Sequence, residues 1–314
     1  MTIRVFVLVV LILWHVAVVD ASTIVIKHKE EVISQIAKGS FFIPYLPDLP
    51  LVDVDQLNLL TEQIEGVVYK TPINAIIDEQ NQIKPEIMGY ELDEIEFKRR
   101  FMQSFYDPSS SYLEIPLKYL YPKVDSELLT QIRTKQIGYY VTYFNPNNKT
   151  RSHNISLASE AINNVVIFPN ESFSFNEIVG KRTAGRGYLP APVIVKGELT
   201  EGIGGGICQV SSTLFNAVDR AGVEILQRYS HSKRVPYVPP GRDATVSWYG
   251  PDFTFKNTYN QPILIRSVSN GGSIIIMIFS SDTIEYEPRN ISSISPQLPE
   301  EMTNSSPSES LTER

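Results

Sequence analysis

The chain has 314 residues, of which 42% are hydrophobic and 10% aromatic, so it can form about two domains with sizeable cores. Its formal net charge of −7 argues against nucleic acid as a partner, and against electrostatic adhesion to anionic lipids or wall polymers. Any recognition by this protein is therefore expected to depend on a specific site.

The N-terminal stretch MTIRVFVLVVLILWHVAVVDAST has the pattern of a secretory signal peptide. Arg4 precedes an apolar run, Val5–Val19, which is shorter than the ~20 residues of a spanning helix. Small residues at Val19 and Ala21 fit a cleavage site, so residues 1–21 are predicted to be removed and the mature protein to be secreted or cell-wall associated. The alternative is an uncleaved membrane anchor, because the early positive charge is weak. No later segment is apolar enough to span, so no membrane contact is expected after cleavage.

Residues 22–136 are predicted to form a small α+β module. The segment PLVDVDQLNLLTEQIEGVVY has apolar residues at helical spacing, namely Leu57, Leu60, Ile64 and Val68. The segments INAIID and EIMGYELD flank the polar turn EQNQIKP, which predicts a strand pair. No polar cluster in this module defines a ligand site, so a spacer without ligand is one interpretation of it.

A second domain is predicted over residues 137–288. It opens with a short helix in SLASEAINN, started by Asn154 or Ser156. The segment QPILIRSVSNGGSIIIMIF predicts a hairpin that turns at Asn270, Gly271 and Gly272. We expect an α+β domain in which one helix, starting at Cys208, packs on a mainly antiparallel sheet or partial barrel.

Residues 289–314, RNISSISPQLPEEMTNSSPSESLTER, are rich in Ser, Pro, Glu and Asn and poor in large apolar residues. Such a composition buries too little apolar surface to offset chain entropy. This segment is therefore predicted to be a disordered tail.

The loop EIVGKRTAGRGY concentrates glycine with positive charge at Lys181, Arg182 and Arg186. Arg182 and Arg186 are candidates for binding a carboxylate, such as the end of a peptide, because guanidinium groups bind carboxylates through two hydrogen bonds. The alternative is a loop whose charges are simply solvated, which is the usual state of exposed arginine.

The stretch GIGGGICQVSSTLFNA contains the only cysteine of the chain, Cys208. It is not a dinucleotide fingerprint, because Ile207 stands where the last glycine is required, and it lacks the GK[ST] of a phosphate loop. No cofactor and no metal are expected. A helix is predicted over residues 208–221, with Cys208 away from its apolar stripe.

A helix N-terminus favours thiolate over thiol, and preceding glycines let another molecule approach the backbone. Cys208 is therefore a candidate nucleophile, and the residues beside it are candidates for holding a substrate, namely Gly204, Gly205, Gly206 and Gln209. The alternative is a small buried cysteine packed under the glycine loop. A secreted chain with one cysteine forms no internal disulfide, so either interpretation leaves the thiol unpaired within the chain.

His231 and Asp243 are the candidate partners of Cys208. Val223, Ile225 and His231 share one face of a predicted strand, and Asp243 opens another predicted strand after a Pro-Gly turn. A nucleophile on a helix N-terminus, a histidine base and an orienting carboxylate follow in the chain order of several thiol enzymes. The alternatives are a structural histidine and an Asp243 that pairs only with Arg242.

The motifs FPNESFSFNEIVGKRTAGRGY, GGGICQVSSTLFNA, RYSHS and YVPPGRDATVSW, in this order, resemble the VanW-type family over residues 137–279. The sequence departs from the family in FPNESF, where the family more often has a glycine turn and Asn170 would replace it. The resemblance implies an exported or envelope protein, mainly of Gram-positive bacteria, with a wall-related role. It assigns no chemistry to Cys208. The segment INAIIDEQNQIKPEIMGYELDEIEF also resembles a peptidoglycan-binding module of some wall proteins.

Two classes of function follow, each with peptidoglycan or its stem peptides as the partner. The first is a thiol enzyme that hydrolyses or transfers peptide bonds of peptidoglycan through an acyl-cysteine. The second is a noncatalytic binding or scaffolding protein of the cell wall that uses the glycine loop as a cradle. An enzyme needs His231 within hydrogen-bond reach of Cys208, whereas a binding protein needs only an open groove with polar rims.

Overall fold

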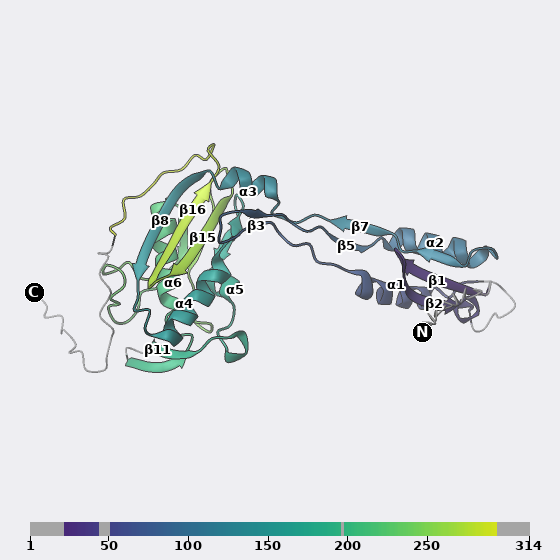
Figure 1. The fold of residues 1–314 in the computed structure, drawn as a ribbon, viewed down its shortest axis with the longest axis horizontal. Coiled ribbons are helices and arrows are strands. Elements are labelled where there is room, and N and C mark those ends of the chain that lie inside the picture. Colours follow the sequence, from purple (N-terminus) through teal and green to yellow (C-terminus); the bar gives the residue numbers. More distant parts are fainter. Residues whose placement is uncertain (1–21, 44–50, 196–197, 294–314) are drawn as a thin grey trace, which may run out of the picture. The chain divides into compact units, whose positions relative to one another are not determined.

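The structure is a computed structural model that describes residues 22–43, 51–195 and 198–293. The predicted signal peptide lies outside these residues. The chain forms two compact units, one within Met1–Asn74 and Glu86–Lys123 and the other within Ala75–Pro85 and Val124–Arg314 (Figure 1). The second unit includes the loop 75–85 and helix α3, Ser126–Ile132, which precede the boundary predicted near residue 137.

The first unit is a small α+β unit with its own core. Helices α1 (Val54–Val68) and α2 (Glu94–Tyr106) are each started by an aspartate, Asp53 and Asp93, whose side chain accepts backbone N–H bonds of the first turn. The predicted apolar stripe of α1 is buried against α2 and the sheet. The strands are β1 (Thr23–His28), β2 (Glu31–Ala37), β5 (Gly89–Leu92), β6 (Tyr112–Glu114) and β7 (Leu117–Leu120), paired in the order β2-β1-β6 and as β5-β7.

The strand pair predicted from INAIID and EIMGYELD is only partly correct. In the second unit, β3 (Ile76–Ile77), which lies in the first predicted segment, pairs with β4 (Ile83–Lys84), which lies in the predicted turn. The Asp78 carboxylate closes that turn by accepting the N–H groups of Gln80 and Gln82. The two predicted segments meet at one bridge, Ile73 with Ile87, and Lys70, which precedes the first segment, bridges to Tyr90.

The second unit is built on an antiparallel sheet in the order β8-β16-β15-β9. Its strands are β8 (Lys135–Tyr143), β9 (Val166–Ile167), β15 (Ile263–Asn270) and β16 (Ser273–Ser280). The predicted hairpin is confirmed, because Asn270 pairs with Ser273 across two glycines with positive φ. The predicted α+β class is also confirmed, and the described strands form no closed barrel.

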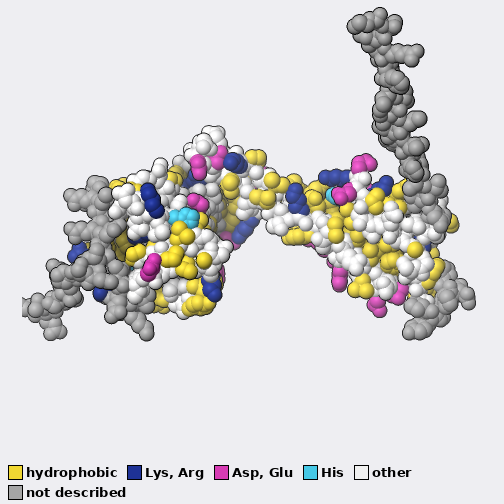
Figure 2. Space-filling view, turned by 60° about the horizontal axis from the view of Figure 1, so that its bottom comes forward, with side chains coloured by type: hydrophobic (Ala, Val, Ile, Leu, Met, Phe, Trp, Pro, Cys, Tyr) yellow, Lys and Arg dark blue, Asp and Glu magenta, His cyan; other side chains and the backbone are white. Residues whose placement is uncertain are grey.

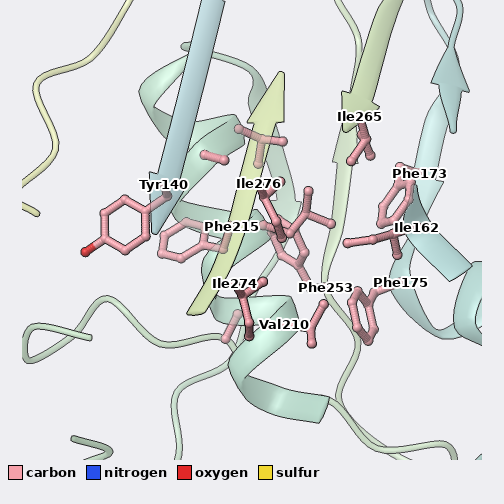
Figure 3. Close-up of a cluster of buried hydrophobic side chains, with 14 of the residues drawn as sticks. Tyr140, Ile162, Phe173, Phe175, Val210, Phe215, Phe253, Ile265, Ile274 and Ile276 are labelled. Atoms are coloured by element: carbon pink, nitrogen blue, oxygen red, sulfur yellow. The ribbon is translucent and has the colours of Figure 1, made fainter. Parts of the chain in front are cut away.

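Helices α4 (Lys149–Ile162) and α6 (Ile207–Arg220) pack on one face of this sheet (Figure 1). Figure 3 shows Val210 and Phe215 of α6 beside Ile274 and Ile276 of β16. Helix α4 begins before the predicted start, because Asn148 caps it. Asn154 instead uses its amide inside the unit, on the backbone of Leu189 and Gly205.

Smaller elements surround this core. Asn170, in the turn before Ser172, has φ +66°. This is the left-handed conformation that a glycine would adopt there, as the sequence predicts. The elements are β10 (Ser172–Ser174), α5 (Phe175–Val179), the turn Ala184–Arg186, β11 (Pro190–Val195), β12 (Glu198–Ile203), β13 (Glu224–Gln227) and β14 (Thr254–Lys256). Strands β11 and β12 form a separate ribbon, and β10-β14-β13 form a third sheet.

The beginning of the predicted tail contacts α6. The Arg289 guanidinium donates to Asp219, and the Arg289 N–H donates to the carbonyl of Arg220. The Arg220 guanidinium donates in turn to Ile291 and Ser293. Residues 294–314 of the predicted tail lie outside the described residues.

Candidate functional site

A cavity of about 820 Å³ lies in the second unit at the N-terminus of α6. Gly204, Gly206 and Cys208 line it, together with His231 from a distant segment. A cavity of this size matches the range of small-ligand sites. The sole thiol of the chain is therefore part of the wall of a ligand-sized cavity.

The glycine loop before α6 needs glycine for two physical reasons. Gly204 and Gly206 take φ values of +87° and +107°, which side chains with a Cβ rarely adopt. At Gly205 a Cβ would lie 2.6 Å from the backbone of Ala191 and Pro192 in β11. Gly204 and Gly206 line the cavity, whereas Gly205 is buried against β11.

Polar residues of α6 fix the segment 242–246 against the helix. The Ser211 hydroxyl donates to the Ala244 carbonyl at 2.6 Å, and the Ser212 hydroxyl accepts the Ala244 N–H at 2.9 Å. The Asn216 amide donates to the Arg242 carbonyl at 2.8 Å. The strand predicted to open at Asp243 is therefore absent, because helix side chains take the backbone groups that a neighbouring strand would use.

His231 and Asp243 meet in this arrangement. His231 lies in a loop beyond Gln227, the last residue of β13. The prediction that a strand carries His231 is therefore also wrong. Its ring Nδ1 and its backbone N lie 2.6 Å from Asp243 Oδ2. Both side chains are nearly buried, at 6% and 9% exposure. Arg242 pairs instead with Asp219 at 2.7 Å, so Asp243 is free to orient His231.

Cys208 contacts this pair from the start of α6. His231 acts on the charge of its thiol, and its Sγ lies 3.5 Å from the Val246 carbonyl and 3.8 Å from Thr245 Oγ1. Helix α6 begins at Ile207, which places Cys208 in its first turn, where backbone N–H groups create positive potential. The thiol thus lies among groups that act on its charge.

These neighbours shift the pKa values of the three groups. Burial by itself raises the pKa of the Cys208 thiol, but the hydrogen bond and charge of His231 outweigh burial and lower it. Burial also disfavours charged His231, yet its hydrogen bonds to Asp243 and Cys208 raise its pKa to about 9. The His231 ring and N–H likewise lower the pKa of Asp243 against the effect of burial. The arrangement favours the thiolate of Cys208 and the imidazolium of His231 relative to the free side chains.

Of the other predicted site residues, Arg182 and Gln209 line the cavity and Arg186 does not. Arg182 lines the cavity, and one guanidinium N–H donates to Asn176 at 2.7 Å. Arg186 is exposed and is absent from the lining, because its guanidinium lies against the backbone of Gly180. Gln209 touches the cavity but is fully buried, and its amide is bonded to Arg151, Thr142 and Tyr143.

Sequence reasoning did not single out several residues of the site. Tyr237 and Trp248 line the cavity, and Ser211, Ser212 and Asn216 fix the segment that carries Asp243. A run of polar residues on one face of an otherwise apolar helix was the available signal for the latter three. Their partner segment could not be read from the sequence, because it lies about 30 residues further along the chain.

Two features are absent from residues 22–43, 51–195 and 198–293. No group of three or more His, Cys, Asp or Glu side chains there could hold a metal ion. No helix in these same segments has the length and apolar character needed to cross a membrane.

The fold and site define an α+β protein with a thiol, a histidine and a carboxylate around one cavity. The model of the VanW-like protein family matches residues 150–279. Over 270 residues the chain is 55% identical to the uncharacterized protein YoaR of Bacillus subtilis (strain 168), which covers 86% of this chain and 89% of that protein. The chain belongs to the VanW-like family.

A second relative is the vancomycin B-type resistance protein VanW of Enterococcus faecalis (strain ATCC 700802 / V583). It is 32% identical over 132 residues, which cover 40% of this chain and 48% of that protein. No solved structure matches the chain.

Proposed function

We propose that this protein is an exported, cell-wall-associated thiol enzyme that acts on peptidoglycan peptides. Cys208 is the nucleophile, His231 moves the proton, and Asp243 orients His231. The observation that carries the proposal is the His231–Asp243 pair, in which Nδ1 lies 2.6 Å from Oδ2, beside a Cys208 thiol whose pKa His231 lowers. This order of nucleophile, base and carboxylate is the one that activates a thiol for attack.

The cell wall as the place of action is supported by the family. The Enterococcus faecalis relative is named as a vancomycin resistance protein, and VanW-type proteins are associated with the envelope. The sequence-predicted signal peptide agrees with export. The cavity adds peptide chemistry to this role, because a thiolate with a histidine that can protonate the leaving amine is the arrangement that cleaves amides through an acyl-cysteine.

The proposed reaction begins when the Cys208 thiolate adds to an amide carbonyl carbon and forms a C–S bond. The first turn of α6 offers positive potential to the developing oxyanion. The C–N bond then breaks, and the leaving amine takes a proton from His231. Water or a second amine attacks the acyl-cysteine, gives a proton to His231 and releases the thiolate, which yields hydrolysis or transpeptidation.

The test is incubation of the purified protein with muropeptides and analysis of the products by mass. We expect products from the unaltered chain and none from Cys208→Ala or Cys208→Ser, because a serine hydroxyl is a far weaker nucleophile than a thiolate. Circular dichroism should show that both variants fold. Muropeptide binding without any product from the unaltered chain would contradict the enzyme and leave a noncatalytic wall-binding protein.

A further inference from the structure

The cavity beside Cys208 is lined by basic groups and by no acidic ones. Arg151, Lys181 and Arg182 line it together with His231, and no Asp or Glu is among the described residues of its lining. The chain as a whole carries a net charge of −7, so this basic lining does not follow from average composition. A cavity walled by one sign of charge attracts ligands of the opposite sign.

Arg182 has hydrogen-bonding capacity that the protein does not use. One guanidinium nitrogen, Nη1, donates to Asn176 Oδ1 at 2.7 Å, and the group lies over the ring of Phe175. The other terminal nitrogen, Nη2, is buried and has no acceptor among the described residues. A buried N–H without a partner is destabilising and rare in native proteins. Arg182 therefore keeps a donor that no described group of the chain uses.

No carboxylate among the described residues accepts a hydrogen bond from Nη2. Asp252 acts on the charge of Arg182, but its own oxygens accept the Ser174 hydroxyl and the N–H groups of Asn176 and Phe253. Burial also lowers the pKa of Arg182, although an arginine stays charged at neutral pH. The charges of Cys208, Tyr188 and Asp252 act in the opposite direction, but none of these groups is hydrogen bonded to Nη2.

Arg182 lies close to the reactive end of α6. A Cβ placed on Gly204 would be 3.1 Å from the Arg182 Cβ, so the Arg182 side chain starts against the glycine loop that precedes Cys208. A cavity of about 820 Å³ has the volume of a sphere roughly 12 Å across, which is about three residues of extended chain at ~3.5 Å each. Because the Arg182 side chain starts against the loop that leads to Cys208, a group bound by Arg182 lies within a few residues of a bond at Cys208.

The wall of the cavity also contains apolar and aromatic side chains. Val193 and Ile203 of the β11-β12 ribbon line the cavity, as do Trp248 and Tyr249. Lys181 Nζ lies 5.0 Å from the centre of the Tyr249 ring, so basic and aromatic groups meet at this wall. Such a cavity suits a short peptide with an anionic end and small apolar side chains.

We propose that Arg182 binds the free C-terminal carboxylate of the substrate peptide, so that Cys208 acts within about three residues of a peptide end. This inference rests on the proposed function and names its substrate class. It replaces the paired site predicted from sequence, because Arg186 does not line the cavity. A substrate whose reactive peptide bond is far from its free C-terminal carboxylate could not place that carboxylate on Arg182 and the bond at Cys208 together.

The first experiment measures binding to the full chain carrying Cys208→Ala, which cannot turn over. Calorimetry compares muropeptides that end in a free carboxylate with the same peptides amidated at that end. The acid should bind about 10- to 100-fold more tightly than the amide, as expected for a charged hydrogen-bonded pair. Arg182→Gln should abolish this preference, Arg182→Lys should retain part of it, and the matched control Arg186→Gln should leave it intact.

The second experiment needs neither turnover nor a peptide. Cys208 is alkylated in the native protein by negatively charged iodoacetate and by neutral iodoacetamide, and the ratio of the two rates is compared with that of free cysteine. The thiolate fraction cancels in this ratio, so an elevated ratio reports local attraction of a carboxylate. Arg182→Gln should lower the ratio several-fold, whereas Arg186→Gln should not change it.

Equal binding of acid and amide, or an Arg182→Gln variant that keeps the preference and the alkylation ratio, would overturn the carboxylate site. Turnover without preference for the acid would overturn this inference alone. A preference for the acid in a protein without turnover would support the carboxylate site while contradicting the proposed catalysis.

Discussion

At the scale of single residues, the charge of Cys208 is decided by opposing effects. Burial favours the neutral thiol, whereas His231 favours the thiolate through a hydrogen bond and its own charge. His231 can do so because Asp243 raises its pKa, together with Cys208, to about 9. A single substitution that removes the His231 ring should therefore favour the neutral thiol of Cys208 over the thiolate.

The first residue-scale prediction concerns alkylation of Cys208 as a function of pH. A thiol whose pKa is lowered is ionised at lower pH, so the rate should rise with pH through a midpoint below the ordinary thiol value of about 8.5. His231→Ala removes the hydrogen bond and charge but leaves the burial, so the midpoint should move upward. The alkylation rate reports on Cys208 alone, because the chain has one cysteine.

His153→Ala is the matched control for this titration. His153 is an exposed histidine of the same unit whose Nε2 bonds the Gly187 carbonyl at 2.9 Å, and its loss should leave the midpoint unchanged. A thiol that reacts only in denaturant, with no response to His231→Ala, would show that Cys208 is a structural residue.

At the scale of elements, α6 joins the core to the site. Its residues from Gln209 to Asp219 are all buried, with apolar groups on the sheet and polar groups on the segment 242–246. The helix can approach β8 closely because β8 has glycine at the crossing point. A Cβ on Gly138 would lie 2.4 Å from the Ala217 carbonyl oxygen of α6.

The element-scale prediction is that Gly138→Ala forces β8 and α6 apart. The atom met is backbone, which cannot swing aside, so we expect a loss of about 1–3 kcal/mol in the free energy of unfolding. Gly66→Ala is the matched control, because Gly66 lies in helix α1 with no atom within 4 Å of an added Cβ.

Gly66→Ala should stabilise the protein by roughly 0.5–1 kcal/mol, since alanine has the higher helix propensity. Urea unfolding followed by circular dichroism measures both changes. Equal effects of the two substitutions would show that the close contact of β8 with α6 does not limit stability.

At the scale of the whole molecule, each unit has its own hydrophobic core. Phe97 and Phe101 are fully buried in the first unit, and Phe253 and Phe255 in the second. Both units also expose hydrophobic side chains on the face shown in Figure 2. Every residue of the proposed catalytic group belongs to the second unit.

We therefore predict that Phe101→Ala destabilises the first unit without changing the thiol. Truncation of a buried phenylalanine costs about 3–5 kcal/mol, so calorimetry should show one unfolding transition moved to lower temperature. The alkylation rate of Cys208 below that transition should equal that of the unaltered chain. A changed rate in the folded variant would show that the first unit acts on the site.

The sequence by itself determined the local features of this protein. Helical spacing and a following glycine predicted α6 to within one residue at each end, and two adjacent glycines predicted the hairpin of β15 and β16. The VanW-type motifs identified the family from residues close together in the chain. These features depend on hydrophobic period and backbone conformation, which neighbouring residues decide.

Only the tertiary structure decided how the site is assembled. It showed that hydroxyls of α6, and not a strand, hold the Ala244 backbone next to Asp243. It also showed that the Gln209 amide is bonded inside the protein, and that Arg182 but not Arg186 lines the cavity. Each of these outcomes depends on which polar group finds a partner far away in the chain. Sequence spacing does not fix such pairs, because a buried donor or acceptor is satisfied by whatever packing brings beside it.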